Sequence, residues 1–182
     1  MTERDPTTGH LIWNPAGQAV IHDMISTRFE LAVELYELVR ELEPKLAHAQ
    51  IARQLVARGY YAMFWAGRAV SLTLCHRDWG MGSGNHGNLP THLEIHTRSD
   101  SWYPYYHELL AQWRALRNCA DYNLLTVLVY SGRHAGRRPK RVEPPYITIN
   151  QAAVDVAYEV EEYLKQSQRL IISRGVHLVR TL

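Results

Sequence analysis

The sequence predicts an all-α fold: an antiparallel bundle of four long helices, with short helices in the connections. Three observations lead to this prediction. Apolar residues recur at helical spacing in four long segments, and the prolines and most glycines lie between these segments or at their ends. No segment alternates apolar and polar residues over a length that indicates a sheet. The 182 residues are enough for one domain with a full hydrophobic core.

Composition narrows the class of protein. The chain is 46% hydrophobic and 21% charged, which is too apolar for a disordered protein. Its net charge of +2 means that any affinity for nucleic acid must come from a local patch. Cys75 and Cys119 lie in segments whose apolar residues recur at helical spacing, as expected of buried free thiols in a reducing compartment. The sequence shows no signal peptide and no apolar run of about 18 residues, so we expect a cytoplasmic protein that does not enter the membrane.

The first half of the chain should form an arm and two long helices. Residues 1–13 are expected to be an irregular N-terminal arm, followed by a helical domain over residues 14–175. Pro at the first helical position predicts a helix over residues 15–43 that ends before the next proline. A second helix is expected over residues 44–76. The glycine-rich stretch from residue 78 to 88 should then be a loop.

The second half should supply two more long helices. A short helix is expected over residues 90–96, and a third long helix from residues 101–104 to Asp121. Residues 124–130 are apolar and β-branched enough for a helix or a strand, and we interpret them as a continuation of the helix.

The last helix begins with a capping signal. Thr148 followed by Gln151 resembles a capping box, and Gly175 predicts the end of the helix. The C-terminal tail, residues 176–182, should pack on the bundle or on a partner.

A polar group follows the apolar face of the third long helix. Arg117, Asn118, Asp121 and Tyr122 lie within six positions, and Arg117 and Asp121 are four apart, so both can point the same way. A cation, an amide, a carboxylate and a phenol form either a functional site or a structural ion pair with a neighbouring aromatic ring.

Two other groups of residues are candidates for binding. A predicted basic loop over residues 131–145 could contact nucleic-acid phosphates or an acidic partner, or be a solvated surface loop. Its cations are Arg133, Arg137, Arg138, Lys140 and Arg141. His92 and His96 are four apart and His86 is nearby, but the pattern is not an established zinc motif and nearby cysteines are absent. We therefore predict no metal and no cofactor.

Four segments together resemble the HEPN-domain superfamily. Residues 57–72, A-R-G-Y-Y-A-M-F-W-A-G-R-A-V-S-L, are similar to its Y-Y-A-x-F-x-A-x-x-x-L-L signature, and H-G-N-L at 86–89 resembles H-x-G-L. R-N-C-A-D-Y at 117–122 resembles R-x-x-A-D-Y, and I-T-I-N-Q-A-A at 147–153 resembles the start of the last helix of the family. The similarity spans about residues 18–170 in the right order.

The resemblance implies a helical bundle, often a homodimer, with the arginine motif near the dimer seam. The superfamily includes RNA-cutting toxins, proteins paired with antitoxins, partners of nucleotidyltransferases and non-catalytic binding modules. Catalytic members carry R-x4-6-H, in which Arg stabilises phosphate charge and His transfers a proton without a metal. Here Asn118 follows Arg117 as the active pattern requires, but positions 122–124 hold Tyr, Asn and Leu.

The missing histidine favours binding over catalysis. We predict an RNA-, nucleotide- or partner-binding protein of a toxin–antitoxin or defence-type system, whose partner is a nucleotidyltransferase or an antitoxin. One alternative is a metal-independent endoribonuclease that uses Arg117 and Asn118 with Tyr122, or with a distant histidine such as His86 or His107. The other is a purely structural dimeric module that the Arg117–Asp121 pair stabilises.

Overall fold

The computed structural model describes residues 3–4, 11–12, 15–47, 49–75, 85–98, 105–122, 127–129 and 146–182. Within these residues the fold is helical, which confirms the all-α class. The elements are α1 (Pro15–Leu42), the 3-10 helix η1 (Glu43–Lys45), α2 (Ala49–Cys75), α3 (Asn85–His96), α4 (Tyr105–Tyr122) and α5 (Ile149–Ser173). Short antiparallel ribbons join β1 (Glu3–Arg4) to β2 (Leu11–Ile12) and β3 (Val127–Val129) to β4 (Tyr146–Thr148). The first ribbon lies in the arm that was expected to be irregular.

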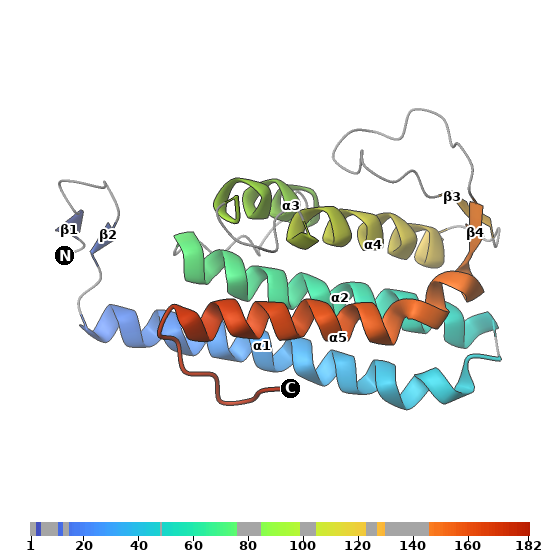
Figure 1. Ribbon diagram of the computed structural model, residues 1–182, viewed down its shortest axis with the longest axis horizontal. Helices are drawn as coiled ribbons and strands as arrows, with labels where there is room; N and C mark the ends of the chain where they lie inside the picture. Colours follow the sequence, from blue (N-terminus) through green and yellow to red (C-terminus); the bar gives the residue numbers. More distant parts are fainter. Residues whose placement is uncertain are drawn as a thin grey trace.

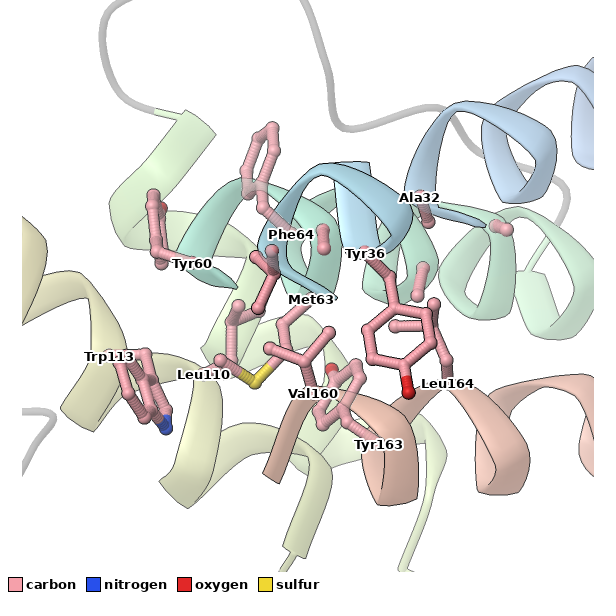
Figure 2. Close-up of a cluster of buried hydrophobic side chains, with 14 of the residues drawn as sticks. Ala32, Tyr36, Tyr60, Met63, Phe64, Leu110, Trp113, Val160, Tyr163 and Leu164 are labelled. Atoms are coloured by element: carbon pink, nitrogen blue, oxygen red, sulfur yellow. The ribbon is translucent and has the colours of Figure 1, made fainter. Parts of the chain in front are cut away.

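Helix α2 is the central element of the bundle. It packs on α1 and α5 along one side and on α3 and α4 along the other (Figure 1). Its buried residue Met63 points toward Leu110 of α4 and Val160 of α5 in the hydrophobic core (Figure 2). Because α2 contributes to every one of these interfaces, its sequence is apolar over more than one face.

Close packing of α5 on α2 requires a glycine. A Cβ atom at Gly59 would overlap the side chain of Val156 and approach Val160 to 3.2 Å. The absence of a side chain at Gly59 therefore lets α5 lie directly on α2. The hydroxyl of Tyr36 on α1 also donates a hydrogen bond of 2.7 Å to Glu161, which ties the outer edge of α5 to α1.

The glycine-rich stretch is partly helical, contrary to the prediction of a loop up to residue 88. Helix α3 begins at Asn85 and includes Gly87 and Pro90. Leu89 and Leu93, one turn apart, are completely buried. Burial of these two leucines outweighs the weak helix propensity of the sequence around them.

The predicted helical continuation of α4 through residues 124–130 is wrong. Helix α4 ends at Tyr122, and Val127–Val129 forms strand β3 opposite β4. The register places Leu128 opposite Ile147, just before α5. A partner strand far away in sequence decides between helix and strand for such a short β-branched run.

The C-terminal tail packs on the bundle of its own chain. After α5, Gly175 adopts a φ of 79°, a left-handed conformation that favours glycine and ends the helix as predicted. Val176 and Leu178 are buried, and the amide of Val179 donates to the Ser26 hydroxyl on α1. Arg180 forms an ion pair with Glu37 at 2.6 Å. Among the helices that the structure describes, none combines the length and apolarity needed to cross a membrane.

Candidate functional site

The predicted pair at the end of α4 is present. Arg117 Nε lies 2.6 Å from Asp121 Oδ2, and the side chains are 17% and 31% exposed. Arg117 Nη2 also donates a hydrogen bond of 2.6 Å to the hydroxyl of Tyr61 on α2, and Nη1 donates one of 3.1 Å to Asn118 Oδ1. The guanidinium group therefore joins α4 to α2 as well as closing a turn of its own helix.

The surroundings of Arg117 favour its positive charge. The Nε–H bond does not point at Asp121, so this contact is an ion pair without a well-formed hydrogen bond. Burial opposes the charge, but Tyr61, Asp121 and Tyr122 together raise the pKa of Arg117 above its ordinary value. The guanidinium carbon also lies 5.2 Å and 5.4 Å from the ring centroids of Tyr61 and Tyr122. Tyr122 itself is 73% exposed, so the open side of the site carries a phenol.

His86, at the start of α3, meets the same aromatic residues of α2. Its Nδ1 lies 2.7 Å from the hydroxyl of Tyr60, and its ring stacks on Phe64 at 4.2 Å between centroids. The Tyr61 ring, which contacts Arg117, is 6.0 Å from the His86 ring. The fold thus brings His86 into the neighbourhood of Arg117, although 31 positions separate them in sequence. His86 is one of the two distant histidines that the endoribonuclease alternative named, and it is the one that lies near Arg117.

Three arginines place positive charge around His86. Arg114 lies one turn before Arg117 on α4, and its guanidinium group faces Gly87, where a Cβ atom would meet Nη1 at 3.1 Å. Arg68 is buried on α2, with its guanidinium carbon 4.3 Å from the ring centroid of Trp65. Burial and then the charges of Arg117, Arg114 and Arg68 lower the pKa of His86. At neutral pH the imidazole is therefore uncharged.

Among the described histidines, His107 lies apart from this cluster. His107 is on α4, ten residues before Arg117, which is about 15 Å along a helix axis. Burial lowers the pKa of His107, while Glu94 and Glu108 act in the opposite direction. His92 and His96 stack at 6.4 Å between ring centroids on α3. No third histidine, cysteine or carboxylate gathers with them as a metal site in the described part of the chain.

Sequence reasoning found some of the site and missed other parts. Arg117, Asn118, Asp121 and Tyr122 all lie on the last turns of α4, as the motif predicted. Arg114 was missed, although its spacing of three from Arg117 is the signal that both share one helix face. The predicted basic loop, with Arg133, Arg137, Arg138, Lys140 and Arg141, falls outside the described residues.

Comparisons with known proteins leave the site to be interpreted from its geometry. The chain matches no family model, and neither a curated protein nor a solved structure is significantly similar to it. The HEPN resemblance therefore rests on the four sequence motifs.

Proposed function

We propose that this chain is a cytosolic, HEPN-like protein that binds RNA through its phosphates at the junction of α2, α3 and α4. The observation that carries the proposal is the pair of guanidinium groups of Arg114 and Arg117 beside an uncharged His86. Asp121 neutralises Arg117, but no carboxylate among the described residues forms an ion pair with Arg114. A phosphate group is the ligand that suits such a cation, because guanidinium binds phosphate oxygens in a bidentate manner.

The contacts between the motif segments support the HEPN-like assignment. Tyr61 from the motif on α2 bonds Arg117 from the R-x-x-A-D-Y motif, and Tyr60 bonds His86 from the H-x-G-L motif. Three segments that resemble one family in sequence thus meet at one point. Exposed Tyr122 adds an aromatic face on which an unpaired base can stack. These features together favour a single-stranded RNA over a duplex.

Binding is best tested by fluorescence anisotropy with a labelled single-stranded RNA. Arg114→Gln should weaken binding, because it removes a cation that makes no ion pair within the described residues. The salt dependence should change as well: the slope of log K against log salt should shrink by about 0.7 for each phosphate that the variant no longer neutralises. Arg174→Gln, at an exposed position after α5, is the matched control.

The slope of log K against log salt, compared between the two variants, decides whether RNA binds at this junction. Equal affinity and equal slope for Arg114→Gln and Arg174→Gln would show that RNA does not bind at this junction. An equal drop in affinity for both variants would indicate only a general effect of net charge, which also contradicts a site at Arg114.

One specific observation favours a second candidate, a metal-independent endoribonuclease. His86 lies beside Tyr61 and has a lowered pKa, so at neutral pH it can accept a proton from a 2′-hydroxyl group. Arg117 would stabilise the phosphate charge that develops. In the tautomer whose Nδ1–H donates to the Tyr60 hydroxyl oxygen, Nε2 of His86 carries the free lone pair. Nε2 would take the 2′-hydroxyl proton as that oxygen attacks phosphorus, and would return it to the 5′ oxygen that leaves as its bond to phosphorus breaks. In this mechanism His86 takes the role of the histidine that is missing from positions 122–124.

RNA integrity on a gel in the presence of EDTA tests the second candidate. The wild type should cleave RNA, whereas Arg117→Ala and His86→Ala should not. His107→Ala is the matched control and should retain cleavage, because His107 lies outside the cluster. Intact RNA with the wild-type protein would refute catalysis and leave the binding proposal to the anisotropy experiment.

The resemblance also implies that the chain assembles with a second copy and with a partner protein. We expect a homodimer, with a nucleotidyltransferase or an antitoxin as the natural partner of a toxin–antitoxin or defence-type system. Sedimentation equilibrium of the purified chain tests the dimer, and a pull-down from the native cells tests the partner.

A further inference from the structure

A pocket of about 340 Å³ lies between α4 and α5, on a different face of α4 from Arg114 and Arg117. Its position follows from the packing, since α4 and α5 each pack closely on α2 but touch one another only sparsely. Space remains between them above α2, near the start of α5. The described residues that line it are Gln112, Trp113, Leu116, Gln151, Ala152, Asp155 and Glu159.

The lining combines an apolar wall with acidic and amide groups. Leu116 and Ala152 are buried, and Trp113 is 2% exposed at the edge of the hydrophobic core (Figure 2). The indole nitrogen of Trp113 donates a hydrogen bond to Glu159 Oε2, which fixes that carboxylate at the pocket wall. An alkyl chain fits the apolar wall, and a hydrogen-bond donor fits the polar side.

Within the described residues, no cation balances the carboxylates of the pocket lining. Asp155 and Glu159 are four residues apart on α5, so they share a face with like charges, and the described residues that line the pocket include no lysine, arginine or histidine. Burial raises the pKa of Glu159 and the charge of Asp155 raises it further, while the Trp113 bond lowers it. Two other carboxylates show the contrast: Glu161 is bonded to Lys165, and Glu37 to Arg180.

We propose that the α4–α5 pocket binds an organic cation: a guanidinium or primary ammonium group on a short alkyl stem. The charged head would pair with Asp155 and Glu159, and the stem would lie against Trp113 and Leu116. The amide oxygen of Gln112 supplies a hydrogen-bond acceptor. The volume suits one ligand the size of an amino-acid side chain, either a free amine or a basic side chain of another molecule. This site is independent of the RNA proposal, because it shares no residue with the Arg114–Arg117 cluster.

Isothermal titration with a pair of probes of equal size tests the charge. n-Butylguanidinium should bind with one-to-one stoichiometry, and n-butylurea, which has nearly the same shape but no charge, should not. N-acetyl-arginine methylamide, titrated separately, presents the same head on a peptide backbone. Binding of the free guanidinium indicates a small metabolite, and binding of the arginine derivative alone indicates a side chain of a partner. Either result supports a cation pocket.

Two variants locate the binding. Asp155→Asn removes an exposed charge, and Glu159→Gln retains an acceptor for the Trp113 indole, so both should fold, which circular dichroism verifies. Each should weaken binding of the guanidinium probe by about tenfold. Glu41→Gln on α1 makes the same change in charge at an exposed position and should bind like the wild type.

The proposal fails on any of three results. It fails if neither cationic probe binds at millimolar concentration, or if butylurea binds as tightly as butylguanidinium. It also fails if the folded Asp155→Asn and Glu159→Gln proteins keep the affinity of the Glu41→Gln control. Because RNA binding is measured with different variants, failure here leaves the proposed function untouched, and the reverse also holds.

Discussion

Two pairs of charged residues, each four positions apart on a helix, have opposite surroundings in this protein. Arg117 and Asp121 on α4 carry opposite charges and lie 2.6 Å apart, and Tyr61 of α2 completes the contacts of the guanidinium group. Asp155 and Glu159 on α5 carry like charges and face a pocket that no cation of the described residues lines. The first arrangement stabilises the fold locally, whereas the second costs free energy that a bound cation would recover. The difference teaches that ligand sites are best sought where charge is left unbalanced.

The largest effect is expected of Gly59→Ala, which should distort the α4–α5 pocket and leave the Arg114–Arg117 cluster in place. Gly59→Ala places a methyl group where Val156 of α5 lies, so α5 must shift away from α2. We expect a loss of about 1–3 kcal/mol in the free energy of unfolding. The α4–α5 pocket should lose its affinity for butylguanidinium, while RNA affinity at the Arg114–Arg117 cluster is retained. Urea denaturation measures the free energy of unfolding, and the two binding assays measure the affinities. An unchanged free energy of unfolding would contradict the close packing of α5 on α2.

Removal of Arg117 should show how much its contacts stabilise the fold. Arg117→Ala leaves Tyr61 and the partly buried Asp121 without their cation, and we expect a loss of about 1–2 kcal/mol. The control is Arg40→Ala, since Arg40 pairs with Glu43 on the surface with 56% and 36% of the side chains exposed. That variant should stay within about 0.5 kcal/mol of the wild type. Equal losses in thermal denaturation would mean that the Arg117 cluster is no more than a surface pair.

Acidification should weaken the Arg117 region through His86. Its folded-state pKa lies below the ordinary value of 6.5, so the unfolded chain takes up the proton first as the pH falls. The stability contribution of neutral His86 is complete above pH 6.5 and is lost as the pH falls from there through the lowered folded-state pKa. The wild type should thus lose more stability than His86→Gln over this interval, as urea denaturation at a series of pH values would show. If the free energy of unfolding falls with pH in the same way for both proteins, this role of His86 is wrong.

The smallest expected effect is a gain in stability. The folded-state pKa of Glu159 is raised, so its stability contribution is present at low pH and is lost as the pH rises above 4.5 through the folded-state value. Glu159→Gln removes the charge that is unfavourable at neutral pH, and we expect a gain of about 0.5 kcal/mol there. Melting temperatures at pH 7 and pH 4 measure it, and the gain should disappear at pH 4. A loss at pH 7 would mean that the Trp113 bond to the charged carboxylate dominates.

Local signals in the sequence predicted most of the helical fold. Pro15 marks the start of α1, and Gly175 follows the end of α5 with the left-handed backbone that its position requires. Helical periodicity also predicted the Arg117–Asp121 pair, because both residues belong to a single turn. These features depend on neighbours within a few positions, which is the range that a sequence pattern covers.

The rest depends on contacts between distant segments. Strand β3 forms because Tyr146–Thr148 pairs with it, and α3 extends to Asn85 because Leu89 and Leu93 are buried by other helices. The approach of His86 to Tyr61, and the pocket beside Trp113, arise in the same way from the packing of α3 and α5. No local pattern encodes such distances, so the sequence could name His86 only as one of several distant histidines.

The central place of α2 also sets an order of folding. Its contact with α1 joins neighbours in sequence across the short turn at η1, so this helical hairpin closes only a small loop and should form early. Its contact with α5 joins segments about a hundred residues apart, and such an interface forms later because more chain entropy is lost. The packing contact between Val156 and Gly59 should therefore form late in folding. A change there should speed unfolding far more than it slows folding.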